Sequence, residues 1–182
     1  MSELKYFSFS YLGNFLSLFD KDKGNFVRRI GSAENRPGQF NHPCGVALDS
    51  GYVYVADTDN HRVQVLTKEG VFLRMIGGGV GTVGPGQLFY PHGVAVDTNH
   101  VYICDVLRTQ VFEKLSGRYV GLLEKKKLGE ADEEAAVPHH LVIYGDRVYL
   151  TDVVHDVIDV YLDKSAYSDL LADDVISRPI SG

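Results

Sequence analysis

Short apolar runs separated by polar turns fill the middle of the chain, from Pro43 to Ile76. The runs are Val46–Asp49, Tyr52–Ala56, Val63–Leu66 and Val71–Ile76. Nothing in this stretch repeats apolar residues at helical spacing, and short β-rich runs bounded by Gly, Asp and Asn are typical of hairpins. The pattern therefore predicts four antiparallel strands in one meander.

The same pattern returns twice further along the chain. PHGVAVDTNHVYICD begins at Pro91 and PHHLVIYGDRVYLTD begins at Pro138, so the unit that starts at Pro43 recurs after 48 and then 47 residues. A period in the forties with four strands per repeat is typical of β-propeller blades. We expect an all-β fold whose inner strands lie near Val46–Asp49, Val94–Asp97 and Leu141–Tyr144.

The repeated residues resemble one known family, the NHL repeat. The unit Pro43–Gly77 carries Pro-x-Gly-Val-Ala, Val-Tyr-Val-Ala-Asp-Thr-x-Asn-His-Arg-Val-Gln-Val and a closing Ile-Gly. The second unit loses two residues after Asp105, and the third has His155-Asp156-Val157 in the loop. The resemblance implies four-stranded antiparallel propeller blades, a fold that carries binding modules and enzymes alike.

The two ends of the chain predict an incomplete ring. Alternating apolar residues place strands in the first 30 residues, and these match the second, third and fourth strands of a blade whose first strand is missing. We expect one partial propeller over residues 1–182, with blades at about 4–31 (incomplete), 43–77, 91–123 and 138–172. Such an open ring of about four blades would expose blade edges and self-associate.

Strand direction predicts where the long loops lie. Antiparallel strands alternate in direction, so the loops between second and third strands share one face with the loops between blades. The loop face consists of 31–42, 77–90 and 124–137 between blades, and 57–61, 106–108 and 153–156 within them. Binding residues tend to lie on long loops held by a rigid scaffold.

Composition and charge limit the partners. The 182 residues carry a formal net charge of −6, which disfavours RNA and anionic membranes, and no apolar run is long enough to span a bilayer. Only Cys44 and Cys104 occur, at non-equivalent positions, so we expect two free thiols and no paired-cysteine zinc module. Free thiols fit a reducing compartment and predict a cytoplasmic location.

Three side chains form a candidate metal site. Cys44, His92 and His139 each follow the leading proline of a repeat, and equivalent positions converge towards the propeller axis. Cys and His are ligands for zinc and other divalent metals. Pro-His at this position also resembles the ligand pattern of peptidylglycine amidating lyases, although Cys44 departs from it. The alternative is that these are ordinary loop residues and that the protein has no cofactor.

Other motifs favour structural roles. Residues 79–84 match G-x-G-x-x-G, but no helix pattern follows, so an interblade loop is the better interpretation. Lys125–Lys127 lie among acidic residues and indicate a solvated loop. Asp57, Asn60 and Arg62 are expected to bond the backbone of their loop.

The favoured function is a noncatalytic interaction module that binds a protein through the loop face. Tyr90, Leu107, Arg108 and His155 are the candidate contact residues, since Tyr and Arg are enriched at binding hot spots. The alternatives are a fragment of a metal-dependent propeller enzyme that resembles the amidating lyases, and an RNA-binding NHL domain. Tyr90 and Leu107 could equally cover the ends of the core.

Overall fold

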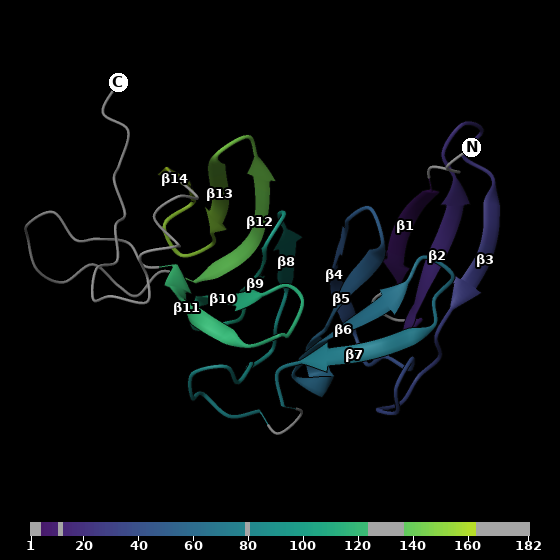
Figure 1. Ribbon diagram of the computed structural model, residues 1–182, viewed down its shortest axis with the longest axis horizontal. Helices are drawn as coiled ribbons and strands as arrows, with labels where there is room; N and C mark the ends of the chain where they lie inside the picture. Colours follow the sequence, from purple (N-terminus) through teal and green to yellow (C-terminus); the bar gives the residue numbers. More distant parts are fainter. Residues whose placement is uncertain (1–4, 11–12, 79–80, 124–136, 163–182) are drawn as a thin grey trace, which may run out of the picture.

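Four antiparallel sheets make up the described part of the chain, and Figure 1 shows them following one another across the molecule. The structure, a computed structural model, describes residues 5–10, 13–78, 81–123 and 137–162. The first two sheets contain β1 (Lys5–Ser10), β2 (Phe15–Asp20) and β3 (Phe26–Ile30), then β4 (Pro43–Leu48), β5 (Tyr52–Asp57), β6 (Arg62–Thr67) and β7 (Phe72–Ile76). The last two contain β8 (Gly93–Val96), β9 (His100–Cys104), β10 (Thr109–Glu113) and β11 (Tyr119–Leu123), then β12 (Pro138–Tyr144), β13 (Arg147–Asp152) and β14 (Val157–Leu162).

The predicted all-β blade architecture is confirmed. Strands pair only with their sequence neighbours within each sheet, and the only helical element of the described residues is the 3₁₀ turn Thr58–Asn60. The predicted inner strands fall in β4, β8 and β12. The first two end one residue earlier than expected because Asp49 and Asp97 turn back, each accepting two backbone N–H groups of the tight turn that follows.

Pairing register shows which strands the first sheet contains. The ladder to the outer strand shifts between Leu18 and Phe19 in β2 and between Val65 and Leu66 in β6, 47 residues later. Asn14, just before β2, has a φ of 53°, and His61, just before β6, has a φ of 52°. Strands β1–β3 therefore correspond to β5–β7, and no described strand occupies the innermost place of the first sheet.

The hydrophobic core lies between successive sheets. Leu16 and Phe40 pack with Val53 and Val55 between the first two sheets, and Tyr54 packs with Ile103 between the second and third. Tyr102, Val111, Val148, Leu150 and Tyr161 fill the space between the third and fourth. Each inner sheet is thus buried on both faces, as the near-continuous apolar pattern of β5, β6, β9 and β10 requires.

The inner strands β4, β8 and β12 lie next to one another and approach closely at two glycines. A Cβ on Gly45 would overlap the backbone carbonyl oxygen of His92, and a Cβ on Gly93 would lie 2.8 Å from the carbonyl oxygen of His139. Contacts this short are not found between real atoms, so the glycine of Pro-x-Gly is required by its neighbour strand.

Two arginines on outer strands also join successive sheets. Arg28 of β3 donates from Nη2 to the carbonyl oxygen of Glu69 in the next sheet, and Arg74 of β7 donates to that of Lys114. The register places Gly121 of β11 where Arg74 lies in β7, so the third sheet makes no such contact with the fourth. These contacts depend on the twist between sheets, so the order of residues along the chain does not predict them.

The described sheets do not close into a ring, since β1–β3 and β12–β14 lie at opposite ends of the row of sheets in Figure 1. Lys125–Lys127 and residues 163–172 of the expected last blade lie outside the described residues. None of the described segments forms a helix long and apolar enough to cross a lipid bilayer.

Candidate functional site

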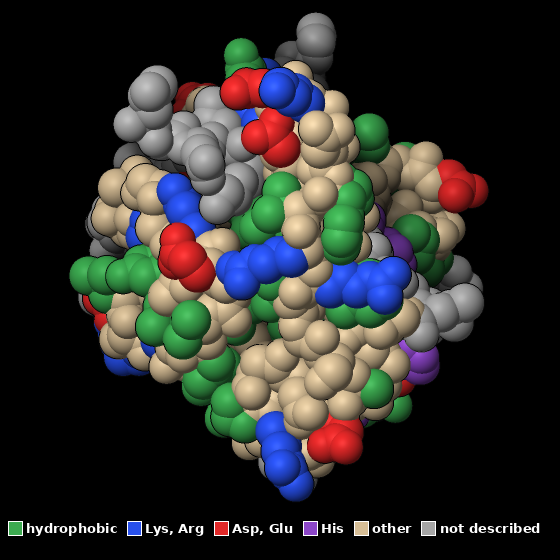
Figure 2. Space-filling view, turned by 90° about the vertical axis from the view of Figure 1, so that its right-hand side faces the viewer, with side chains coloured by type: hydrophobic (Ala, Val, Ile, Leu, Met, Phe, Trp, Pro, Cys, Tyr) green, Lys and Arg blue, Asp and Glu red, His purple; other side chains and the backbone are tan. Residues whose placement is uncertain are grey.

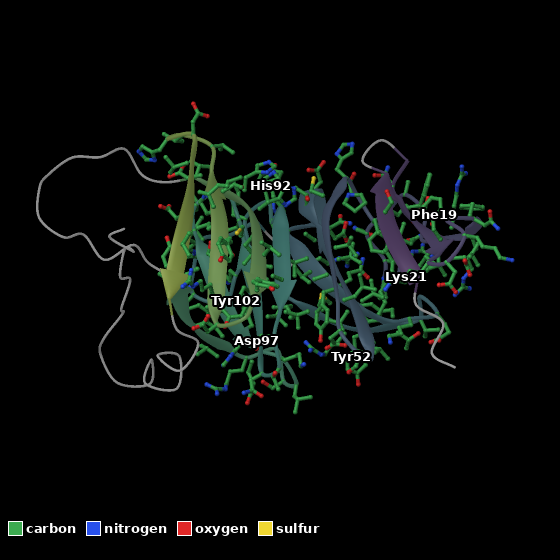
Figure 3. The ribbon with its side chains drawn as sticks, turned by 90° about the horizontal axis from the view of Figure 1, so that it is seen from above. Phe19, Lys21, Tyr52, His92, Asp97 and Tyr102 are labelled. Atoms are coloured by element: carbon green, nitrogen blue, oxygen red, sulfur yellow. The ribbon has the colours of Figure 1, made fainter. Side chains whose placement is uncertain are left out.

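The long loops lie together on one face of the sheets, as strand direction predicts. Asp59 N donates to Asn41 O at 3.1 Å, Val106 N to Phe89 O at 3.2 Å and Val153 N to Val137 O at 3.2 Å. Each bond joins a loop between second and third strands to a loop between blades. In Figure 3, His92 lies at one edge of the sheets, and Tyr52 and Asp97 lie at the opposite edge.

A buried network organises the first of these loops. Asp57 is fully buried, and its Oδ2 accepts bonds from Arg62 Nε at 2.7 Å and Gln64 Nε2 at 2.9 Å. Its Oδ1 accepts from the backbone N–H of Asn41 at 2.7 Å. Because Asn60 also donates to this carboxylate, the predicted structural role of Asp57, Asn60 and Arg62 agrees with their contacts.

The second loop repeats this network with a shorter tip. Gln110 Nε2 donates to Asp105 Oδ2 at 3.3 Å and to Gln87 O at 2.6 Å, as Gln64 does to Asp57 and Gln39. Arg108 Nη2 donates to Gly84 O at 2.7 Å. Arg108 therefore occupies the place of Arg62 and fixes the interblade loop.

The deletion lies after Asp105, as predicted, but Arg108 was grouped with the contact candidates and not matched with Arg62, so its counterpart relation was missed. Arg62-Val-Gln-Val and Arg108-Thr-Gln-Val align directly, and this Arg-x-Gln-Val pattern is the signal that could have identified it. The residues removed are loop-tip residues before the arginine, which leaves Leu107 at the tip.

His155 has a structural role in the third loop, where its side chain hydrogen-bonds a buried carboxylate. Its Nδ1 lies 2.6 Å from Asp152 Oδ2, in the position where Asn60 bonds Asp57. Burial acts to raise the pKa of Asp152, but the bonds from His155 and from the backbone N–H groups of Val154, His155 and Val137 outweigh it and lower the pKa to about 2. The pair is thus held as a charged carboxylate with a hydrogen-bonded imidazole.

Tyr90 is displayed by a strained backbone. Its φ is 50°, in the left-handed region that non-glycine residues seldom adopt, and its N–H donates to His61 Nδ1 at 3.1 Å. The ring of Tyr90 meets those of His61 and Phe89 edge-on, with centroids 4.4 and 4.9 Å away. These ring contacts leave the Tyr90 side chain partly exposed on the loop face.

Leu107 lies beside this aromatic group. It is 50% exposed, although it is a leucine, and the neighbouring Val106 bonds to the backbone of Phe89. The N–H of Leu107 donates to Asp105 Oδ1 at 2.9 Å, which fixes the turn that carries the side chain. We name the half-buried His61 and Phe89 together with the exposed Tyr90 and Leu107 the loop-face patch.

The candidate metal residues come together only in part. The rings of His92 and His139 have centroids 4.9 Å apart, and His140 lies 5.0 Å from His139. The Cys44 thiol instead donates to His42 O at 3.4 Å. Within the described ranges, no group of three or more His, Cys, Asp or Glu side chains is arranged to hold a metal ion. The metal site stays a prediction.

Burial shifts the pKa values of two histidines and of the two cysteines in opposite directions, and in both cases it favours the neutral side chain. Burial, followed by the charge of His139, lowers the pKa of both His92 and His140, so these rings are held neutral. Burial raises the pKa of the Cys104 thiol to about 12 and raises that of Cys44. Both cysteines are free, and neither has the lowered pKa of a reactive thiolate.

Comparison with known sequences matches the best of the repeats. Residues 40–66, which contain β4, β5 and most of β6, match the sequence model of the NHL repeat. The chain contains an NHL repeat. A 36-residue segment, 19% of this chain, is 58% identical to the B-box type zinc finger protein ncl-1 of Caenorhabditis elegans. The matched segment is 4% of ncl-1, so the chain corresponds to a small part of that protein.

Solved structures confirm the propeller fold. The computationally designed Ika4 protein superposes with a TM-score of 0.58 at 14% identity, covering 90% of this chain and 88% of that one. A catalytically inactive virginiamycin B lyase from Staphylococcus aureus, solved with quinupristin, gives a TM-score of 0.58 at 15% identity, covering 90% of this chain and 53% of the lyase. At such identities the likeness establishes the fold of this chain and not its activity.

Proposed function

We propose that residues 1–182 form a single partial NHL-repeat propeller that acts as a noncatalytic interaction module. Its blades are those expected at about 4–31, 43–77, 91–123 and 138–172. The partner is a protein that binds the loop-face patch. Tyr90 and Leu107 make the contact, whereas Arg108 and His155 hold the loops that present them.

One observation carries this proposal: an exposed tyrosine and an exposed leucine lie on two neighbouring loops that a backbone bond from Val106 to Phe89 joins. Tyr90 adopts a left-handed backbone, and Leu107 lies on a turn fixed by Asp105. His42, at the equivalent position before Pro43, also has a left-handed backbone, so the repeat sets this conformation and here uses it to present an aromatic ring. Aromatic anchors bordered by polar loops are typical of protein interfaces.

The alternative functions have less support. The net charge of −6 disfavours binding to RNA, whose phosphates attract basic surfaces. A metal-dependent enzyme would need three protein ligands, and the described residues bring together only the imidazoles of neighbouring blades. A protein partner therefore remains the better explanation of the exposed apolar group.

The test uses two leucines that flank the same strand. Leu107 precedes β10 on the loop face, and Leu115 follows β10 at the tight turn on the opposite face, where it is 81% exposed. Leu107→Ser should remove captured protein partners in quantitative affinity capture, whereas Leu115→Ser should leave them unchanged. Circular dichroism should show the same β signal for both variants.

Two results would contradict the proposal. Equal capture by the Leu107→Ser variant and the parent would place the contact elsewhere. Loss of the β signal in Leu107→Ser alone would mean that Leu107 belongs to the core. Arg108 is left unchanged in this test because its substitution would release the interblade loop through Gly84 and Gln87.

A further inference from the structure

The last sheet leaves an apolar face open. Val142, Tyr144 and Ile158 lie on the face of β12–β14 that points away from the third sheet, and all three are exposed, Ile158 by 65%. On the same face, Val142 pairs with Tyr149 and Tyr149 pairs with Val160. These three residues form one row that crosses all three strands of the sheet. None of them belongs to the core between the third and fourth sheets.

The same row is buried in the inner sheets. Its counterpart in the second sheet is Ala47, Tyr54 and Val65, which pack against β8–β11. Its counterpart in the third sheet is Ala95, Tyr102 and Val111, and all three are buried. The face of the last sheet is therefore built like a surface that another sheet covers.

The first sheet leaves the complementary face open. By register, Phe19 and Phe26 correspond to Leu66 and Phe72, which pack against the first sheet. Phe26 is 56% exposed and meets Phe19 edge-on, while the Arg29 guanidinium lies 4.3 Å from the centre of the Phe15 ring. Figure 2 looks onto the side of the molecule that carries β3, where hydrophobic side chains lie beside Lys and Arg.

We propose that this chain pairs head to tail with a second copy of itself, each copy covering the last sheet of the other with its own first sheet. This association is independent of the loop-face function proposed above. The packing repeats, over the second and third strands that both end sheets contain, the one that joins successive sheets within the molecule. Such a head-to-tail pair closes when the four sheets of each copy turn through half of a ring.

Size and charge support a second copy as the occupant. The chain covers 53% of the virginiamycin B lyase propeller, so two copies match the size of one complete ring, and eight sheets lie within the usual range for propellers. The two faces also lie on sheets of opposite charge. Leaving out positions that face the neighbouring sheet or are buried, the first sheet carries Arg29, Lys21 and Lys23 against Asp20 and Asp22, whereas the last sheet carries Asp146 and Asp156 against Arg147.

The first experiment measures mass in solution. Sedimentation or light scattering over a range of concentrations should give twice the 20.2 kDa of one chain, with no series of larger species, since the pair is closed. A monomer at all concentrations would overturn the proposal. This is also the result expected if residues of the same copy cover the open faces. A ladder of higher multiples would show open head-to-tail growth and overturn the closed pair.

The second experiment tests the head-to-tail arrangement with one charge on each face. Ile158→Asp should give a monomer because it places a carboxylate on the open apolar face of the last sheet. Phe26→Asp should give a monomer because it does the same on the open face of the first sheet. Val71→Asp is the matched control, since Val71 is 60% exposed beside β7 in the second sheet, away from both faces. The control should keep the doubled mass, and thermal unfolding should show that all three variants fold.

Mixing the two monomeric variants decides the symmetry. The intact last sheet of Phe26→Asp can pack on the intact first sheet of Ile158→Asp, so the mixture should recover a heterodimer that neither variant forms alone. Its affinity should be lower than that of the parent pair because only one of the two interfaces is intact. A mixture that stays monomeric, or a single variant that still dimerises, would exclude the head-to-tail contact.

Discussion

The second and fourth sheets descend from one repeat pattern, but they are held together differently. In β4–β7 the buried Asp57 receives Arg62, Gln64 and a backbone N–H of the preceding interblade loop. In β12–β14 the register places Val157 where Arg62 lies and Asp159 where Gln64 lies. The comparison teaches that the apolar pattern is enough to form the strands. Hydrogen bonds between a sheet and its interblade loop depend in addition on the polar side chains around the buried aspartate.

The loss of the network coincides with a more open sheet. Tyr54 of the second sheet is fully buried, but its counterpart Tyr149 is only half-buried, and Val157 is exposed where Arg62 is buried. His155 replaces Asn60 as the side-chain partner of the buried aspartate. The fourth sheet thus keeps the aspartate and its backbone bonds, but Val157 and Asp159 stand where the second sheet has the arginine and glutamine that bond the carboxylate.

The largest difference is expected when the two buried aspartates are removed. Asp57→Ala leaves the Arg62 guanidinium buried without its carboxylate, which should lower the free energy of unfolding by about 3–5 kcal/mol. Asp152→Ala removes bonds to a partly exposed His155 and to three backbone N–H groups, and should cost about 1–3 kcal/mol. Urea unfolding of the two variants measures the difference, and equal losses would show that the arginine adds nothing to the second sheet.

A smaller effect should separate the two contacts between inner strands. Gly45→Ala would push a methyl group into the His92 carbonyl, a strain that should cost about 1–3 kcal/mol. Gly93→Ala should cost less, because the gap to His139 O is wider. Gly78→Ala is the control, since its Cβ would meet open space. Thermal unfolding would contradict this order if Gly93→Ala were the more damaging variant.

The smallest effect concerns pH and the histidines between the third and fourth sheets. The pKa values of His92 and His140 are lowered on folding, so the folded state resists protonation. Their contribution to the free energy of unfolding is present above the ordinary histidine pKa of 6.5 and is lost as pH falls below it. Urea midpoints at pH 7.5 and pH 5 should therefore differ by less in His92→Gln/His140→Gln than in the parent.

Hydrogen exchange can locate that pH effect. Amides of β12 should lose protection at pH 5 before those of β4, because Cys44 stands in the second sheet where His92 and His139 stand in the others. A uniform loss across all four sheets would assign the pH dependence to another group.

The apolar pattern alone determined the fold class, the position of every inner strand and the side on which the long loops lie. These follow from local chemistry: alternation fixes strands, Gly and Asp fix turns, and antiparallel pairing fixes direction. The repeat also identified Asp57, Asn60 and Arg62 as structural. It gave Tyr90 and Leu107 as candidates for contact, and their exposure is compatible with that role.

The tertiary structure decided what depends on distances between repeats. Arg108 holds the interblade loop because its guanidinium lies within hydrogen-bonding distance of the Gly84 carbonyl. The His155 side chain hydrogen-bonds Asp152. The close approach of Gly45 to His92, the arginines that join outer strands and the two open apolar faces also depend on how one sheet twists against the next. A sequence records which residues recur, but the spacing between sheets arises only when their side chains pack.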